Sequence, residues 1–219
     1  GGSYEDHVLG DFGSLSYDFS SDPAGQLVSA ASLDEASGAG DQIDVGSGDN
    51  VVIAGFGGDT VDSSSTIGQT NIVLGDGGSA TFAATGERLD IASGVTTEGA
   101  VDTITIADGD NVVIGGAAAD VIMTGAGDDL VVGDHGALDY NAGSVVDGVI
   151  DSVTTIYDSV GGSDVITTGD GSNVVLGGFA GDQVTGGADN DLVVGDNGTV
   201  TYAGGALSEV ATDDLLTST

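Results

Sequence analysis

Short aliphatic runs alternate with turns rich in Gly and Asp along most of the chain, at a spacing of nine residues. In the segments that start at Asp102 and Asp164, an Asp or Asn recurs at this interval, and a Val or Ile always follows two positions later. A β-branched run of this length is typical of a strand, and Gly allows the tight turns between strands. The pattern predicts an all-β chain of 13 units, four in each of three segments and one at the start.

Two units would make one coil of 18 residues with a strand on each side. Stacked coils would pair these strands in parallel, about 4.8 Å apart. The inward Val and Ile side chains would then form a narrow core, each contributing roughly 1.5–3 kcal/mol on burial. Because such a core is thin, we expect a stronger interaction to hold the turns.

The positions that flank each inward residue differ between the two strands of a coil. One strand type is apolar on both sides, as at Val112 and Ile114, whereas the other is mostly polar, as at Thr103. A strand layer that is apolar on both faces is expected to be buried from both directions.

The segments between repeats, 10–35, 75–96 and 133–158, contain strand-like runs such as Ala137–Tyr140. We expect these segments to fold back over the apolar sheet with Tyr and Phe pointing inward. Coverage by another chain or repeat, as in a fibre or lattice, is the alternative.

The repeats predict one continuous solenoid in four parts. Residues 1–35 hold the end of a preceding repeat and an inter-repeat segment, 36–96 the first repeat, 97–158 the second, and 159–219 the third with the start of another inter-repeat segment. No signal peptide is visible at Gly1. We therefore expect a piece of a longer protein, with neighbouring repeats or identical subunits as partners along the solenoid axis.

Charge excludes several partners. The chain has 36 Asp and Glu against one basic residue, Arg88, and a formal net charge of -35. It cannot neutralise nucleic-acid phosphates or bind an anionic membrane surface, and no apolar stretch reaches the roughly 18 residues needed for membrane insertion. There is no Cys for a disulfide or a thiolate site. Divalent cations are the obvious counter-charge for this many carboxylates.

The units resemble the RTX nonapeptide family, G-G-x-G-x-D-x-U-x with U a large aliphatic residue. The matching stretches include Thr124–Val132 (TGAGDDLVV) and Gly115–Met123 (GGAAADVIM). The resemblance implies a calcium-bound, right-handed parallel β-roll or β-helix solenoid with two nonapeptides per coil, of a kind found in secreted toxins, proteases, adhesins and surface-layer proteins. The fourth position departs from Gly in several units, for example at Ala118 and Ala180.

Calcium prefers six to eight oxygen ligands from carboxylates and carbonyls. Residues one coil apart should lie on one edge and clamp an ion between coils. The candidate metal ligands at the sixth position of each unit are Asp6, Asp41, Asn50, Asp59, Asn71, Asp102, Asn111, Asp120, Asp129, Asp164, Asn173, Asp182 and Asp191.

The candidate pairs are not equivalent, because Asn keeps an oxygen ligand but loses the charge. The pairs expected to fill first are Asp41 with Asp59, Asp102 with Asp120, and Asp164 with Asp182. The mixed pairs Asn111 with Asp129 and Asn173 with Asp191 should bind more weakly. Asn50 with Asn71 is uncharged and interrupted by an insertion, so it is the poorest candidate.

A second acidic element follows the last unit of each repeat, in the pattern Gly-Asp-x-Gly. Its aspartates are Asp11, Asp76, Asp134 and Asp196. They either complete the shell of the final ion or close a turn, as Asp does well.

No constellation for catalysis stands out. His7 and His135 lack the spacing of a zinc pair, and His135 is expected to be a solvent-facing turn residue. No Ser lies in a G-x-S-x-G elbow. The paired carboxylates are already explained by the repeat, so the chain is not expected to be an enzyme.

The leading interpretation is a calcium-binding structural segment of a large secreted or cell-surface protein, such as an adhesin extender, an extracellular fibre or a surface-layer component. It would fold on calcium binding outside the cell, where calcium modules bind at about 10⁻⁴–10⁻³ M. A ligand-binding solenoid for ice or carbohydrate is the runner-up, based on outward residues such as Thr103 and Thr105, although Met123 interrupts that array. A calcium-binding appendage of a secreted hydrolase is the third interpretation.

Overall fold

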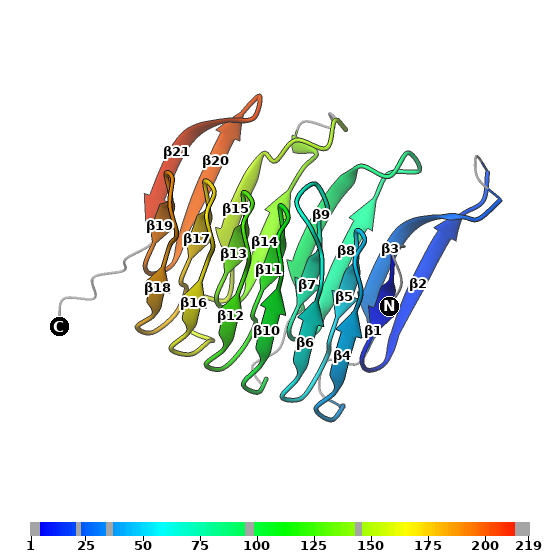
Figure 1. The fold of residues 1–219 in the computed structure, drawn as a ribbon, viewed down its shortest axis with the longest axis horizontal. Coiled ribbons are helices and arrows are strands. Elements are labelled where there is room, and N and C mark those ends of the chain that lie inside the picture. Colours follow the sequence, from blue (N-terminus) through cyan, green and yellow to red (C-terminus); the bar gives the residue numbers. More distant parts are fainter. Residues whose placement is uncertain (1–4, 21–22, 34–36, 95–98, 143–145, 213–219) are drawn as a thin grey trace.

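The structure is a computed structural model that describes residues 5–20, 23–33, 37–94, 99–142 and 146–212. The strands in these ranges form three sheets (Figure 1). Two sheets are parallel and the third is antiparallel. Within the described ranges there is no helix that is long and apolar enough to cross a membrane.

Thirteen short strands make up the two parallel sheets, one strand for each predicted unit. The middle sheet contains, in spatial order, β1 (His7–Leu9), β5 (Val51–Ile53), β7 (Ile72–Leu74), β11 (Val112–Ile114), β13 (Leu130–Val132), β17 (Val174–Leu176) and β19 (Leu192–Val194). The outer sheet contains β4 (Gln42–Val45), β6 (Thr60–Ser63), β10 (Thr103–Ile106), β12 (Val121–Met123), β16 (Val165–Thr167) and β18 (Gln183–Thr185). Strands of the two sheets alternate along the chain, as in a β-roll.

The register of the parallel strands continues across the inter-repeat segments. Within a repeat, Thr103 pairs with Val121, 18 residues further on. Thr103 also pairs with Thr60 on its other side, although an inter-repeat segment separates the two. The inter-repeat segments therefore leave the two parallel sheets and return to them without interrupting the strand order of either sheet.

A first apolar core fills the space between the two parallel sheets. It contains the predicted inward residues, and ten of the thirteen are buried: Ile43, Val52, Val61, Val73, Ile104, Val113, Ile122, Val131, Ile166 and Val175. Val8 and Val184 are partly buried. Val193 is 46% exposed because its strand, β19, is the last of the middle sheet.

The inter-repeat segments form the third sheet, here called the cover sheet. It consists of four hairpins: β2 (Gly13–Asp18) with β3 (Gln26–Ser32), β8 (Gly78–Phe82) with β9 (Arg88–Ser93), β14 (Gly136–Asp139) with β15 (Ser152–Thr155), and β20 (Gly198–Ala203) with β21 (Ala206–Thr212). Neighbouring hairpins pair with one another, so all eight strands are continuous.

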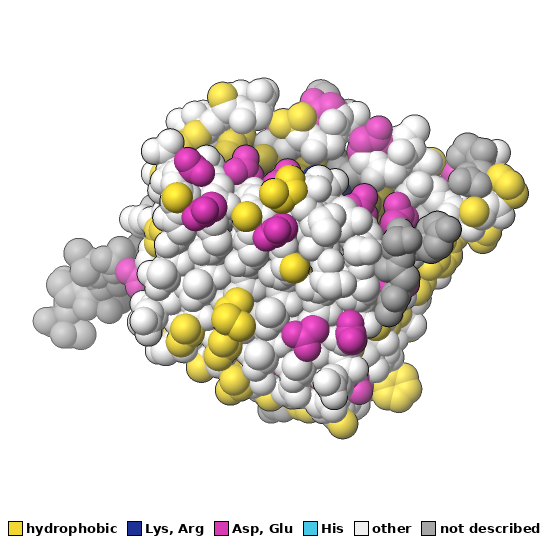
Figure 2. Space-filling view, viewed as in Figure 1, with side chains coloured by type: hydrophobic (Ala, Val, Ile, Leu, Met, Phe, Trp, Pro, Cys, Tyr) yellow, Lys and Arg dark blue, Asp and Glu magenta, His cyan; other side chains and the backbone are white. Residues whose placement is uncertain are grey.

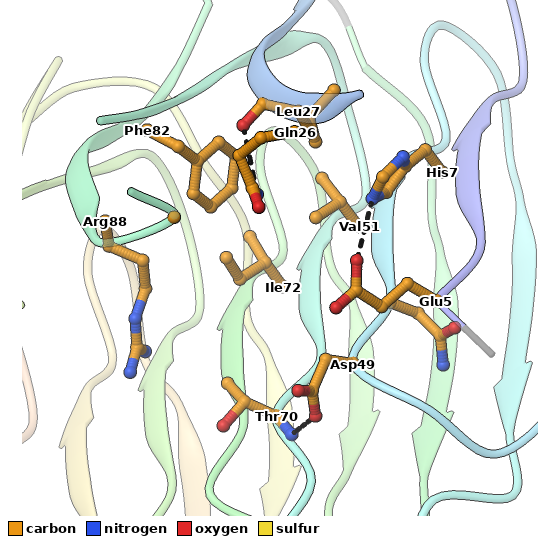
Figure 3. Close-up of a pocket in the computed structure, with 12 residues that line it drawn as sticks. Glu5, His7, Gln26, Leu27, Asp49, Val51, Thr70, Ile72, Phe82 and Arg88 are labelled. Atoms are coloured by element: carbon orange, nitrogen blue, oxygen red, sulfur yellow. Dashed lines mark hydrogen bonds and ion pairs between the residues drawn. The ribbon is translucent and has the colours of Figure 1, made fainter. Parts of the chain in front are cut away.

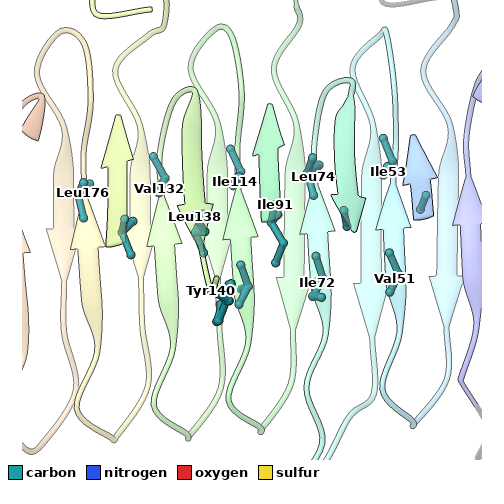
Figure 4. Close-up of a cluster of buried hydrophobic side chains, with 14 of the residues drawn as sticks. Val51, Ile53, Ile72, Leu74, Ile91, Ile114, Val132, Leu138, Tyr140 and Leu176 are labelled. Atoms are coloured by element: carbon teal, nitrogen blue, oxygen red, sulfur yellow. The ribbon is translucent and has the colours of Figure 1, made fainter. Parts of the chain in front are cut away.

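A second apolar core joins the cover sheet to the middle sheet (Figure 4). Ile114 of β11 is 1% exposed, and Ile91 of β9 and Leu138 of β14 are similarly buried. The prediction that the chain covers its own apolar sheet is confirmed. All three residues of β5, β7 and β11 are buried, because these strands face a core on each side.

The aromatic residues only partly follow the prediction that they point inward. Tyr140 is 3% exposed, and the Arg88 guanidinium lies 5.0 Å from the centre of its ring. Tyr17 and Tyr157, in contrast, are 37% and 38% exposed. Phe12 and Phe19 are also exposed, at 66% and 63%, so the prediction holds for Tyr140 and not for these residues.

The prediction of a solvent-facing His135 is wrong. This residue is fully buried, and its ring meets Tyr157 edge-on at 5.4 Å between centroids. His135 directly precedes β14, at the point where the chain leaves the parallel stack for the cover sheet. Its side chain is therefore enclosed where the two layers join.

Candidate metal centre

The sixth position of every unit directly precedes a strand, which places these residues in two rows. The row in front of the outer sheet is all aspartate and is called the carboxylate edge: Asp41, Asp59, Asp102, Asp120, Asp164 and Asp182. The row in front of the middle sheet is called the amide edge: Asp6, Asn50, Asn71, Asn111, Asp129, Asn173 and Asp191. The face of the molecule shown in Figure 2 also carries acidic side chains at its surface.

A ladder of hydrogen bonds runs along the carboxylate edge. The main-chain N–H of Asp102 donates to Oδ1 of Asp120 at 2.8 Å, and that of Asp120 donates to Oδ1 of Asp164 at 2.8 Å. The same bond joins Asp41 to Asp59, Asp59 to Asp102, and Asp164 to Asp182. The ladder thus includes the predicted pairs. It also crosses between repeats, which a spacing of one coil did not predict.

The second oxygen of each of these carboxylates is buried without a hydrogen-bond partner. This holds for Oδ2 of Asp41, Asp59, Asp102, Asp120, Asp164 and Asp182. Asp59, Asp102, Asp120 and Asp164 are at most 2% exposed. Burying an unpaired carboxylate is costly, and such groups are normally paired or bind a metal.

The raised pKa values of these aspartates also indicate that a cation is needed beside their ionised carboxylates. The pKa of Asp120 is raised to about 10, mainly by burial and in smaller part by the neighbouring carboxylates of Asp102 and Asp164. Burial likewise raises the pKa of Asp102 to about 8 and that of Asp164 to about 7. Basic side chains cannot balance this row, because Arg88 is the chain's single Lys or Arg.

Glycine in these turns lets carbonyl and carboxylate oxygens approach the backbone closely. A Cβ added to Gly115 would fall on the carbonyl oxygen of Gly133 and 2.7 Å from Oδ2 of Asp120. The same arrangement recurs at Gly75 and Gly177, each beside an unpaired aspartate oxygen and a carbonyl. Carboxylate and carbonyl oxygens of neighbouring turns therefore lie close together, and this donor set fits calcium.

Carbonyl oxygens are essential to any such site. No three His, Asp or Glu side chains come together as a metal-binding group in the part of the chain that the structure describes. Two carboxylates from adjacent coils would have to be supplemented by carbonyls of the Gly-rich turns. This division of ligands is the one expected from the coordination chemistry of calcium.

The aspartates of the Gly-Asp-x-Gly element contact the turns of the carboxylate edge. Oδ2 of Asp11 accepts a hydrogen bond from the N–H of Phe56 at 2.7 Å, and Oδ2 of Asp76 accepts one from Ala117 at 2.6 Å. Asp134 accepts bonds from the N–H groups of Gly162 and Phe179. These hydrogen bonds hold turns of the following repeat. Closing a turn is one of the two roles expected for these aspartates, the other being an ion ligand.

An ion-ligand role for these aspartates stays a prediction. Oδ1 of Asp76 is buried without a partner. Burial raises the pKa of Asp76 to about 7 and that of Asp134 to about 8. Asp196, in contrast, is exposed.

The amide edge is internally hydrogen bonded. The side-chain amide of Asn50 donates to Oδ1 of Asn71 at 2.7 Å, and that of Asn71 donates to Oδ1 of Asn111 at 2.8 Å. The Asn50–Asn71 pair, expected to be the poorest calcium site, is therefore a direct contact between two amides despite the insertion between them.

A cavity of about 210 Å³ lies between the middle sheet and the cover sheet (Figure 3). Arg88 lies on one side of it and His7 on the other, where Nε2 of His7 is 3.9 Å from a carboxylate oxygen of Glu5. Burial lowers the pKa of His7. Asn50 also lines this cavity, so the cavity borders the amide edge and is separate from the row of unpaired carboxylates.

Four stretches of the chain match the RTX calcium-binding nonapeptide repeat, at residues 35–65, 106–137, 159–193 and 167–201. They contain five of the six aspartates of the carboxylate edge, all except Asp102. Calcium at several sites is therefore supported by the repeat as well as by the donor set. No curated protein matches the chain.

Proposed function

Because the chain is built on repeats of the RTX calcium-binding nonapeptide family, we propose that it is a calcium-stabilised structural segment of a large secreted or cell-surface protein. Its role would be that of an adhesin extender, an extracellular fibre or a surface-layer component. The observation that carries the proposal is the row of buried Oδ2 atoms without partners along the carboxylate edge.

In this proposal each ion lies between adjacent coils. Asp102 and Asp120 would contribute a carboxylate oxygen each, and the carbonyl groups of the neighbouring Gly-rich turns would complete the shell. When bound, calcium supplies positive charge and bridges oxygens that otherwise repel one another. The protein's contribution is to fix Oδ1 of each carboxylate through a backbone N–H, so that Oδ2 is held towards the turn.

The proposed architecture is a right-handed solenoid with two nonapeptides per coil. The 18-residue offset of the paired strands within a repeat supports two nonapeptides per coil. The repeats would be 36–96, 97–158 and 159–219, each contributing four parallel strands and one hairpin of the cover sheet. Residues 1–35 contribute one strand and one hairpin, as the end of a preceding repeat.

Folding would be coupled to calcium. Without it, a chain with a formal net charge of -35 would have to bury a row of unpaired carboxylates. Because binding requires the folded site, the free energy of binding adds to the stability of the fold. Sites that fill at about 10⁻⁴–10⁻³ M would keep the chain loose at cytosolic calcium and folded outside the cell.

A structural role also involves neighbours along the solenoid axis, either further repeats or identical subunits. Val193 in β19 is 46% exposed, whereas Val131 and Val175 occupy the same position in adjacent strands and are buried. An additional coil placed against β19 would bury Val193 in the same way. Electron microscopy of the chain in calcium would show whether copies assemble end to end.

The central experiment is a calcium titration of the chelated chain, followed by far-ultraviolet circular dichroism, with bound calcium counted by equilibrium dialysis. We expect strand content and melting temperature to rise together with the number of bound ions, and magnesium at the same concentration to have much less effect. An unchanged spectrum and melting temperature after complete chelation, with no calcium retained on dialysis, would overturn the proposal.

A further inference from the structure

We propose that the amide edge holds its turns without calcium, because the side-chain nitrogens of Asn50, Asn111 and Asn173 take the position that the ion takes on the carboxylate edge. This inference rests on the proposed calcium sites of the carboxylate edge. In this proposal, calcium ions hold the turns of the carboxylate edge, whereas hydrogen bonds of asparagine side chains hold the turns of the amide edge.

Each of these three amides donates back to its own turn. The Nδ2 of Asn111 lies 2.8 Å from the carbonyl oxygen of Gly109 and 3.2 Å from that of Ala107. The Nδ2 of Asn173 lies 3.2 Å from the oxygen of Gly171 and 3.1 Å from that of Gly169. Asn50 makes the corresponding contacts, at 3.2 Å with Gly48 and 3.4 Å with Gly46. In every case the acceptors are the carbonyls two and four residues earlier.

The same nitrogens also bridge to the next coil. Nδ2 of Asn111 is 3.0 Å from Oδ1 of Asp129, and Nδ2 of Asn173 is 3.0 Å from Oδ1 of Asp191. Each nitrogen is therefore surrounded by two turn carbonyls and a side-chain oxygen of the adjacent coil. A calcium ion between coils would use this same kind of donor set.

The two edges place their side chains alike, so the difference lies in one atom. On both edges a main-chain N–H of one coil donates to the side-chain oxygen of the next, as from Asn111 to Asp129 at 3.0 Å and from Asp102 to Asp120 at 2.8 Å. The remaining atom is Oδ2 in Asp and Nδ2 in Asn. Oδ2 of an ionised Asp cannot donate to a carbonyl and needs a cation between them, whereas an NH₂ group donates directly.

The asparagines of the amide edge need no cation, because their buried polar atoms already have hydrogen-bond partners. Asn50, Asn71, Asn111 and Asn173 are at most 1% exposed, yet among the described residues none of their polar atoms is buried without a partner. An entering ion would have to displace the NH₂ group and break the bonds that it makes. The asparagines are therefore substitutes for the ion and not weak ligands for it.

Asp129 differs from the asparagines beside it on this edge, because its side chain has a second oxygen in place of the NH₂ group. Its side chain is 1% exposed and its Oδ2 accepts no hydrogen bond of normal geometry, although the Thr124 hydroxyl lies close enough to offset part of the rise in pKa that burial gives the carboxyl group. In the row, Asp129 lies between Asn111 and Asn173. We expect an ion at Asp129 and none at the flanking asparagines. Ions should then bind where the sixth position is an aspartate with a buried, unpartnered Oδ2, and not at every unit.

The test is a pair of reciprocal substitutions, each with calcium counted by equilibrium dialysis and the calcium midpoint of folding measured by circular dichroism. Asn111→Asp exchanges the bridging nitrogen for an oxygen, so we expect it to bind more calcium than the wild-type chain and to need more calcium to fold. Gln42→Glu, which adds the same charge on the exposed face of β4, is the control and should leave the count unchanged.

The reverse change, Asp120→Asn, should lower the ion count and reduce the calcium needed for folding, because an amide now closes that turn. Hydrogen exchange at the calcium midpoint of folding adds a test on the wild-type chain: the turn amides of the amide edge should be better protected than those of the carboxylate edge.

The outcomes separate the two proposals. A wild-type chain that binds no calcium overturns the proposed function. A wild-type chain that binds calcium, with an unchanged ion count in Asn111→Asp, overturns this inference alone. If Asn111→Asp fails to fold even in saturating calcium, Asp120→Asn decides: a reduced calcium requirement supports the inference, and an unchanged or increased one overturns it.

Discussion

The main-chain N–H of Asp102 donates to Oδ1 of Asp120 at 2.8 Å, while Oδ2 of Asp120 is buried with no partner. One bond thus orients the carboxylate and leaves its other oxygen directed at the turn. Because this relationship recurs from Asp41 to Asp182, it organises a whole edge of the molecule.

Removing the Asp102 and Asp120 carboxylates together should reduce calcium binding. We expect Asp102→Ala with Asp120→Ala to bind fewer ions, and the calcium midpoint of folding to rise by at least about tenfold, since even outer-shell partners of a metal site are worth 10–100-fold. The measurements are equilibrium dialysis and a titration followed by circular dichroism.

The matched control for this variant is Asp44→Ala with Asp62→Ala. These two aspartates are exposed, pair with each other in the outer sheet, and carry the same total charge. Their loss should leave the ion count unchanged. Equal calcium binding by the wild-type chain and the Asp102/Asp120 variant would show that the assignment of these ligands is wrong.

Stability of the chelated protein should fall as pH rises. Burial raises the pKa of Asp59 to about 6 and that of Asp102 to about 8, from an ordinary value of 3.8. Between the ordinary and the raised values, the folded chain binds more protons than the unfolded chain. The free energy of unfolding therefore decreases with pH across this window.

In chelator we expect a higher melting temperature at pH 5 than at pH 8. Asp120→Asn should flatten this dependence, because it removes the carboxyl group whose pKa is raised to about 10. Saturating calcium should oppose the trend, since metal ligands must be deprotonated. A melting temperature that rises from pH 5 to pH 8 in chelator would contradict the electrostatic picture.

The contact between the cover sheet and the middle sheet should contribute strongly to stability. Ile91→Ala removes a fully buried side chain from this core, and we expect a loss of about 2–5 kcal/mol. Ile67→Ala makes the same chemical change at a residue that is 74% exposed, so it should cost far less. Denaturant unfolding in saturating calcium measures both, and similar losses would mean that the cover sheet does not pack as described.

Replacing the alanine in a left-handed turn should stabilise the protein. Ala118 has a φ of 77°, at the fourth position of a unit, where the nonapeptide pattern has Gly. A non-Gly residue in this region costs about 1–2 kcal/mol, so we expect Ala118→Gly to gain about 0.5–1 kcal/mol after the added flexibility of the unfolded chain.

The control for this change is Ala126→Gly. Ala126 occupies the preceding position of its own unit and is not among the residues with a positive φ. Gly there should destabilise the protein by about 0.5–1 kcal/mol. Melting temperatures in saturating calcium should move in opposite directions for the two variants, and a loss of stability in Ala118→Gly would refute the argument.

Local pattern alone was enough to predict the strands and the first core. Each unit carries its own turn residues, its inward Val or Ile, and its Asp or Asn within nine positions, so no knowledge of distant partners was needed. For the same reason, the outward Val112 and Ile114 predicted a sheet buried on both faces. Because the same nine-residue pattern recurs along the chain, the strand and turn positions can be assigned from the sequence.

Tertiary structure decided which coils are neighbours and what the second atom of each side chain meets. Asp59 and Asp102 are adjacent on one edge only because a whole hairpin leaves the stack between them, and sequence spacing does not report such an excursion. The burial of His135 depends on where the chain passes between layers. Whether Asn111 is a ligand or a substitute for one depends on the distances from its amide to the carbonyls of Ala107 and Gly109, and only a folded turn brings these atoms together.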